Sequence, residues 1–114
     1  MSALPMRQID ADVYVGPQLT PEAMAQAAAK GFKSVVNNRP DFEHDAAQPT
    51  SAAIEAAALA AGLVYRHLPV SGSYQSPEQI AQMAALLEEL PRPLLMFCRS
   101  GARSTALYHQ AIAA

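Results

Sequence analysis

The chain has 114 residues, of which 51% are hydrophobic and 16% are charged, so we expect one folded domain over 1–114 rather than a disordered segment. No apolar run approaches the ~18 residues of a membrane-spanning helix, so we expect no membrane partner. The net charge of −2 argues against nucleic acid as a partner, because nucleic-acid binders normally carry a basic surplus.

Turn and cap signals divide the first half of the chain into strands and helices. Short β-like pieces lie within 7–18. Thr20-Pro21-Glu22 predicts a helix start, because a capping hydroxyl is followed by a proline at the first helical position. Gly31 ends that helix. A buried strand is expected over 32–37, followed by a polar loop over 38–48.

The same alternation continues in the middle of the chain. Pro49-Thr50-Ser51 opens a helix that Gly62 closes, and 63–70 is the next predicted strand. A loop over 71–75 then leads to Ser76-Pro77-Glu78-Gln79, which is a capping box with proline at the first helical position.

The last elements complete an α/β order. The helix that begins near Ser76 ends before Pro91, an apolar strand spans 93–97, and a final helix runs from about Arg103 to the end of the chain. Regular alternation predicts a three-layer fold, with a mostly parallel central sheet and helices on both of its faces. Ligands of such sheets bind beyond the carboxyl ends of the strands.

The lone cysteine lies in such a position, between the last strand and the last helix. The segment Cys98-Arg99-Ser100-Gly101-Ala102-Arg103-Ser104 can direct backbone N–H groups into one concavity beside a helix N-terminus. Gly101 permits a tight turn, and Arg103 can form a two-point contact with an oxyanion. The same surroundings lower the pKa of a thiol, so Cys98 is the predicted nucleophile, with its sulfur open to solvent. The alternative is a buried structural cysteine.

One cysteine also limits the chemistry of the chain. It excludes an internal disulfide and a zinc site built from cysteines, and we expect no cofactor. Residues 1–8 contain no apolar signal core, and a lone thiol without an export signal predicts the cytoplasm.

The segment from Cys98 to Ser104 resembles the active loop of single-domain rhodaneses and a shortened protein-tyrosine-phosphatase loop. The rest of the chain is similar to the bacterial beta-lactamase hydrolase-like phosphatase domain family, also labelled as sulfur transferases. The stretches that carry this similarity are 35–41, 48–50, 65–70 and 76–77. The resemblance implies a fold like that of the dual-specificity phosphatases.

Two features depart from tyrosine phosphatases. Four residues separate Cys98 from Arg103, as in rhodaneses, where tyrosine phosphatases have five. The segment 69–74, where dual-specificity phosphatases place an acidic residue, contains no carboxylate. Asp41 is the predicted replacement acid, with Glu43 or His44 as the next candidates.

The residues of the loop that contains Asp41 are also open to two other interpretations, a structural role and a metal site. Asp41 can instead cap the loop while Arg39 holds it by a salt bridge. The cluster of Asp41, Glu43, His44 and Asp45 lacks the helical histidine spacing of zinc enzymes, so we predict no metal site.

Three functions follow from these residues. The first is a phosphatase in which Cys98 and Arg103 act on a phosphoester, with Asp41 as the acid. The second is a sulfurtransferase that carries a persulfide on Cys98, and the third is a non-catalytic anion-binding module. All three predict a small anionic ligand. Its predicted contacts are Arg39, Tyr74, Arg99, Ser100, Gly101, Ala102 and Ser104.

Overall fold

A five-stranded sheet forms the centre of the computed structural model, which describes residues 4–44 and 46–114. Its strands are β1 (Arg7–Asp10), β2 (Val13–Gly16), β3 (Ser34–Asn37), β4 (Val64–His67) and β5 (Leu94–Phe97). They lie in the order β1-β2-β5-β3-β4. β1 is antiparallel to β2, and the other neighbouring pairs are parallel.

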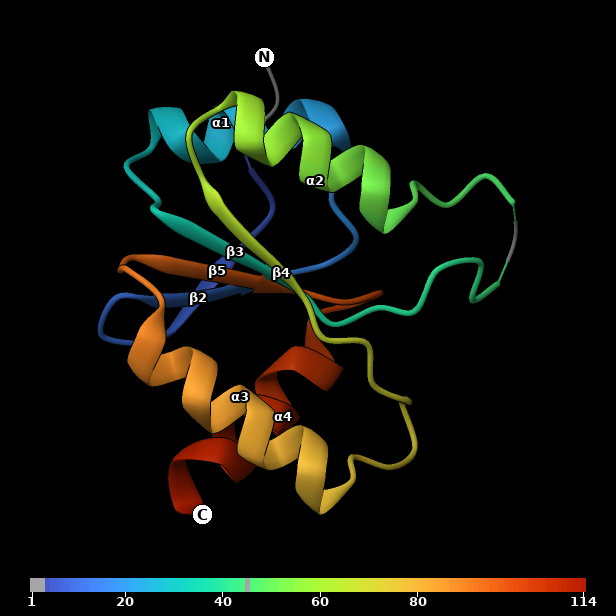
Figure 1. Ribbon diagram of the computed structural model, residues 1–114, viewed down its shortest axis with the longest axis vertical. Coiled ribbons are helices and arrows are strands. Elements are labelled where there is room, and N and C mark those ends of the chain that lie inside the picture. Colours follow the sequence, from blue (N-terminus) through green and yellow to red (C-terminus); the bar gives the residue numbers. More distant parts are fainter. Residues whose placement is uncertain (1–3, 45) are drawn as a thin grey trace.

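Helices cover both faces of this sheet. The helices α1 (Pro21–Ala29) and α2 (Ser51–Ala60) lie together on one face, while α3 (Pro77–Glu89) and α4 (Ala102–Ala113) lie on the other (Figure 1). This arrangement confirms the predicted three-layer α/β fold. In the part of the chain that the structure describes, no helix has the length and apolarity needed to cross a bilayer.

The two faces bury separate apolar clusters. Neighbouring residues of a strand point to opposite faces, so Val35 packs in the cluster beneath α1 and α2 and Val36 in the cluster beneath α3 and α4. Other members of the first cluster are Met24, Ile54, Leu95 and Phe97, and of the second Met83, Met96 and Leu107. A central strand is therefore buried on both sides, which explains the continuous apolar run of β5.

The predicted helix starts are confirmed. The side chains of Thr20, Thr50 and Ser76 each accept a hydrogen bond from the backbone N–H three residues later. Ser76 and Gln79 form the complete capping box, because the Gln79 side chain also accepts from the Ser76 amide at 2.8 Å.

The predicted strand over 32–37 is too long at its start. Gly31 adopts φ 97°, and the amide of Phe32 turns back to donate to the Ala27 carbonyl at 3.1 Å. That bond satisfies a carbonyl at the end of α1 and removes the Phe32 amide from the sheet. β3 consequently begins at Ser34.

The predicted strand over 63–70 also ends early, at His67. Pro69 has no N–H to donate, so regular pairing stops there. Val70 still donates its amide to the Asn38 carbonyl at 3.0 Å. The segment after β4 is thereby held beside the end of β3.

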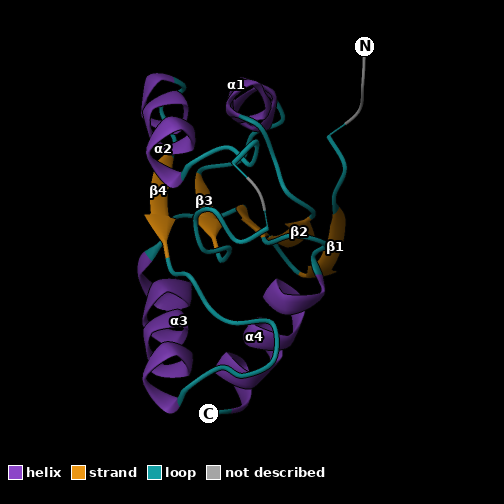
Figure 2. Ribbon diagram, turned by 90° about the vertical axis from the view of Figure 1, so that its right-hand side faces the viewer, coloured by secondary structure: helices purple, strands orange, loops and turns teal. Residues whose placement is uncertain are grey.

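The parallel register places the ends of four strands in one row. Gly16 and Asn37 are both aligned with Phe97, and His67 is aligned with Asn37. The loops that follow these strands therefore gather at one edge of the sheet, which faces the viewer in Figure 2. That edge contains the candidate site.

A buried tyrosine joins α2 to this edge. The Tyr65 hydroxyl accepts a hydrogen bond from Asn37 Nδ2 at 3.0 Å and lies 2.7 Å from Ser51 Oγ. We expect Tyr65→Phe to lower the free energy of unfolding by about 1–3 kcal/mol, because two buried polar groups lose their partner. Urea denaturation at neutral pH measures this change.

The matched control is Tyr74→Phe, since the Tyr74 side chain is 64% exposed. This control should change the free energy of unfolding by less than about 0.5 kcal/mol. Equal losses in the two variants would contradict a special role for the buried hydroxyl.

Candidate active site

Cys98 directly follows β5, the middle strand of the sheet. Its amide donates to the Gly16 carbonyl at 3.4 Å, which continues the pairing with the β2 side. The sequence predicts this position at the carboxyl end of a central parallel strand. α4 begins four residues later, at Ala102, one residue before the predicted start at Arg103.

The loop after Cys98 folds back over the sulfur. Gly101 adopts φ 96°, a left-handed conformation that favours glycine, and its amide donates to Cys98 Sγ at 3.1 Å. A β-carbon at this position would lie 3.4 Å from the Gly16 carbonyl oxygen. The predicted tight turn is therefore present, and it directs a backbone donor at the thiol.

Burial and hydrogen bonding act oppositely on this thiol. Burial raises the pKa of Cys98, but hydrogen bonds from Ser104 and from the amides of Gly101 and Ser100 outweigh it, so the pKa lies below its usual value. The Ser104 hydroxyl donates its one proton to Asn38 Oδ1 at 2.8 Å. The backbone amides are therefore the donors that remain directed at a thiolate.

The exposure of the sulfur differs from the expectation. Cys98 is only 1% exposed, although it belongs to neither of the two apolar clusters. Its sulfur is instead surrounded by the polar groups of the loop that Cys98 opens. The expectation of a sulfur open to solvent is wrong, because this loop folds back across it.

Arg103 lies in the first turn of α4 and points toward two other loops. Its Nη1 donates to the Val70 carbonyl at 3.2 Å and lies 2.9 Å from Glu43 Oε2, while Nη2 lies 3.3 Å from Glu43 Oε1. Its Nε is buried and has no hydrogen-bond partner among the residues that the structure describes. This nitrogen is a donor suited to an oxygen of an anionic ligand.

Glu43 is the carboxylate that the fold brings to Arg103. It also accepts from Arg39 Nε at 2.9 Å, so two arginines share it. Burial raises the pKa of Glu43, but the hydrogen bonds from Arg103 and Arg39 outweigh that effect and hold the pKa below its usual value. The carboxylate therefore stays charged at neutral pH.

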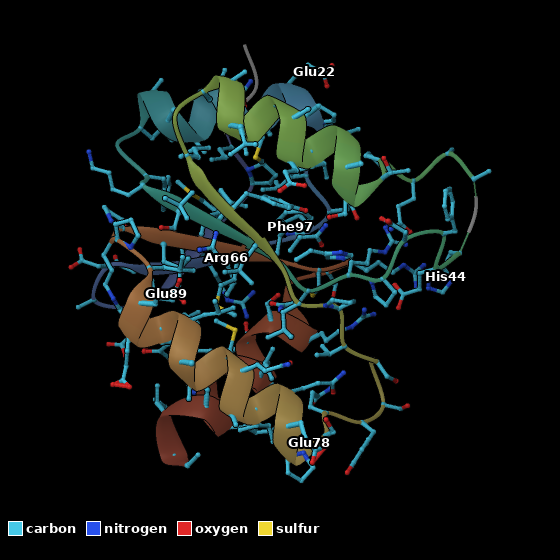
Figure 3. All side chains as sticks on the ribbon, viewed as in Figure 1. Glu22, His44, Arg66, Glu78, Glu89 and Phe97 are labelled. Carbon is cyan, nitrogen blue, oxygen red and sulfur yellow. The ribbon has the colours of Figure 1, made fainter. Side chains whose placement is uncertain are left out.

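Asp41, the predicted acid, is used differently. Its Oδ1 accepts from the backbone amide of Ser51 at 2.7 Å, at the start of α2, and its side chain is otherwise exposed. His44 lies outward on the same loop (Figure 3), with Nε2 4.0 Å from Glu43 Oε1. Arg39 forms a salt bridge with Glu43, as the alternative interpretation of this loop predicts.

The remaining predicted ligand contacts are mostly exposed. Arg99, Ser100, Ala102 and Tyr74 all present their side chains to solvent. Asp45 lies outside the described residues. Among those that are described, no group of three or more His, Cys, Asp or Glu side chains is placed to hold a metal ion.

Sequence reasoning missed two residues at this edge. Asn38 is fully buried, accepts from Ser104 and donates Nδ2 to the Leu68 carbonyl at 3.0 Å. Gly72 lies so close to Arg103 that an added β-carbon would be 3.3 Å from Nη2. A polar residue directly after a buried strand is a signal for the first, whereas the second depends on contact between distant segments.

The lowered pKa of Cys98 is open to measurement. Alkylation of the folded protein by iodoacetamide should reach half its maximal rate well below pH 8.5, the approximate value for a free thiol, because the loop donors favour the thiolate. The same protein unfolded in urea is the control and should titrate near that value. Its plateau rate should be higher, since the sulfur is then uncovered. Coinciding profiles would contradict a stabilised thiolate.

Solved structures share this fold. A Neisseria meningitidis protein provisionally described as a phosphatase is 31% identical, with a TM-score of 0.81 over 89% of this chain and 71% of that one. The core catalytic domain of the PP-IP phosphatase Siw14 from S. cerevisiae is 16% identical, with a TM-score of 0.70 over 93% of this chain and 65% of that one. At that identity, the likeness to Siw14 shows the fold alone.

Two curated sequence relatives are described as beta-lactamase hydrolase-like proteins. A beta-lactamase hydrolase-like protein of Agrobacterium fabrum is 37% identical over 81 residues, which are 71% of this chain and 19% of the relative. One of Xylella fastidiosa is 31% identical over 105 residues, 90% of this chain and 24% of the relative. The chain thus spans less than a quarter of these curated relatives. Residues 5–114 match the phosphatase-like domain of the beta-lactamase hydrolase-like proteins, and the chain belongs to that family.

Proposed function

We propose that this domain is a cysteine-dependent phosphatase that acts on small phosphoesters through Cys98 and Arg103. The observation that carries the proposal is a pair of groups where the loop after β5 meets α4. The Cys98 thiol accepts a hydrogen bond from a backbone amide at 3.1 Å, and the buried Nε of Arg103 has no hydrogen-bond partner among the described residues. Phosphoryl transfer to sulfur needs both a nucleophile and donors for the phosphoryl oxygens. The phosphatase-like description of the family supports this assignment.

In the first proposed step, the Cys98 thiolate attacks phosphorus. A sulfur–phosphorus bond forms as the bond to the leaving oxygen breaks, and that oxygen takes a proton. Loop amides and Arg103 stabilise the charge on the other phosphoryl oxygens. Water then attacks phosphorus, which releases inorganic phosphate and restores the thiolate.

Access to the sulfur requires some movement. Cys98 is 1% exposed, so a phosphoester cannot reach it until the groups that cover it shift. The segment that folds back over the sulfur is the loop over 99–101, in which the Gly101 amide donates to Cys98 Sγ at 3.1 Å. A shift of this short loop is the movement that the proposal requires.

Two carboxyl groups, those of Glu43 and Asp41, are candidates for the donor of the leaving-group proton. Glu43 stays charged because two arginines hold it, so it is a poor proton donor. We retain Asp41 as the proposed acid, since it is exposed on the neighbouring turn. Aryl phosphates need this proton less than alkyl phosphates do, because their leaving groups are more stable as anions.

Sulfur transfer is a second candidate, favoured by the four-residue interval between Cys98 and Arg103. In that reaction the thiolate attacks the outer sulfur of thiosulfate, forms a persulfide and releases sulfite. A thiolate acceptor then takes the outer sulfur and leaves Cys98 as thiolate. The reducing cytoplasm that we propose as the location would protect such a thiol from disulfide formation.

Two substitutions test the phosphatase. Cys98→Ser should abolish hydrolysis of an aryl phosphate, because a serine hydroxyl is a far weaker nucleophile at neutral pH. Arg103→Ala should lower kcat by about 10²- to 10³-fold, as expected for loss of a transition-state donor. Steady-state turnover of p-nitrophenyl phosphate measures both.

Absence of phosphatase activity would leave sulfur transfer and anion binding as the two alternatives. If the unmodified protein does not turn over phosphate, mass spectrometry after incubation with thiosulfate should decide for sulfur transfer through a gain of ~32 Da on Cys98 that thiol removes. A protein that does neither but binds sulfate at the loop is an anion-binding module.

A third substitution tests the proposed acid. Asp41→Asn should lower turnover of an alkyl phosphate by about 10²-fold or more and leave aryl turnover much less affected, since only the poor leaving group needs the proton. The ratio of the two rates is the measurement. Equal losses for both substrates would assign Asp41 to capping α2 alone.

A further inference from the structure

The Glu43 carboxylate lies between two arginine side chains. Its Oε1 accepts from Arg39 Nε at 2.9 Å and from Arg103 Nη2 at 3.3 Å, and its Oε2 lies 2.9 Å from Arg103 Nη1. The side chain of Glu43 is 18% exposed and that of Arg103 is 11% exposed. The contact is therefore largely shielded from water, so it holds its geometry better than a surface ion pair.

The two-point contact uses one edge of the Arg103 guanidinium. Nη1 and Nη2 both face the carboxylate, and Nη1 also donates to the Val70 carbonyl at 3.2 Å. Nε is left buried and without a hydrogen-bond partner in the described chain. We propose that Glu43 is a positioning residue, which holds Arg103 by the edge remote from Nε so that Nε is presented to the oxyanion.

Glu43 can hold Arg103 only because its own position is determined. Its backbone amide donates to Gln48 Oε1 at 3.2 Å, and Gln48 Nε2 donates in turn to the Pro40 carbonyl at 2.8 Å. On the other side, Arg39 Nη1 donates to Gln18 Oε1 at 3.0 Å. The carboxylate is therefore tied to the loop after β3 and to the segment after β2.

The loop after β4 limits the position of the Arg103 guanidinium from another side, at Gly72. A β-carbon added to Gly72 would lie 3.3 Å from Arg103 Nη2 and 3.5 Å from Nε. The absence of a side chain at this position lets the loop after β4 approach the arginine. Displacing Arg103 by a few tenths of an ångström from this side should disturb the same geometry that Glu43 maintains.

The charges agree with a positioning role. Arg39 and Arg103 contribute two positive charges and Glu43 one negative charge, so the cluster keeps a net charge of +1 beside the loop amides. The net positive charge still attracts an anion. The contact with Glu43 keeps the Arg103 guanidinium from turning away into solvent. A proton donor would need a neutral carboxyl, which two arginine partners disfavour.

A double-substitution cycle tests this inference, which rests on the proposed function only in naming the ligand as an oxyanion. The probe is tungstate, a phosphate-like oxyanion, and its dissociation constant is measured by calorimetry. Glu43→Gln should weaken tungstate binding by about 10-fold, since a misplaced charged donor loses most of its hydrogen-bond energy. In an Arg103→Ala background the same change should have less than about a twofold effect, because the residue that Glu43 acts through is gone.

Two further variants complete the design. Glu89→Gln is the matched control, since Glu89 forms an exposed pair with Arg66 at 3.1 Å, away from the loop that carries His44 (Figure 3), and it should leave tungstate binding unchanged. Gly72→Ala should weaken tungstate binding several-fold with Arg103 present and not without it. If thermal denaturation shows that Glu43→Gln is unfolded, Glu43→Asp takes its place, because the shorter side chain keeps the charge but cannot hold Arg103 in the same geometry.

The outcomes separate the inference from the proposed function. Equal losses with and without Arg103, or no loss in either background, would overturn the positioning role even if the protein hydrolyses aryl phosphate. Coupled losses in a protein that hydrolyses no phosphate would support positioning and reject the phosphatase. A protein that binds no tungstate at all would overturn the inference.

Discussion

A negative charge on a buried sulfur is stable only where nearby donors replace the water that the sulfur has lost. At Cys98 those donors are backbone amides, and they converge because Gly101 adopts a left-handed conformation that turns the chain back over the strand end. The sheet supplies the rest of this geometry. β5 lies between β2 and β3, so Cys98 emerges at the middle of the edge where the other loops meet.

The arginine of the site depends on a different set of contacts. Arg103 belongs to α4, but its guanidinium is held by Glu43 from the loop after β3 and by the Val70 carbonyl from the segment after β4. Asn38 connects these parts, because it binds both the Leu68 carbonyl and Ser104. Buried polar residues at the strand ends therefore align three loops that are distant in the sequence, while the apolar clusters hold the layers together.

The same arrangement is compatible with both of the proposed reactions. A thiolate surrounded by amides is a nucleophile toward phosphorus and toward a sulfane sulfur alike, and fold by itself does not choose between them. The choice depends on the size of the anion that the four-residue interval accommodates and on a proton for the leaving group. Hydrogen bonds from two arginines hold the pKa of Glu43 below its usual value, which disfavours Glu43 as the source of that proton.

Sequence analysis alone predicted the succession of strands and helices along the chain, the helix starts and the placement of Cys98 at a strand end. These depend on local signals: capping hydroxyls, prolines and the apolar run of β5. Sequence also indicated Arg103 beside the cysteine. The three-dimensional fold was needed to show which carboxylate of the 39–44 loop meets that arginine, since Glu43 and Arg103 are 60 residues apart in the chain. Asp41 and Glu43 are both carboxylic acids in the same loop, so the sequence does not distinguish their roles. In the structure, the Asp41 carboxylate accepts from the amide at the start of α2, whereas the Glu43 carboxylate contacts the Arg103 guanidinium. The turn at Gly101 was predicted from the sequence, but the burial of Cys98 was not, because burial depends on what the turn packs against.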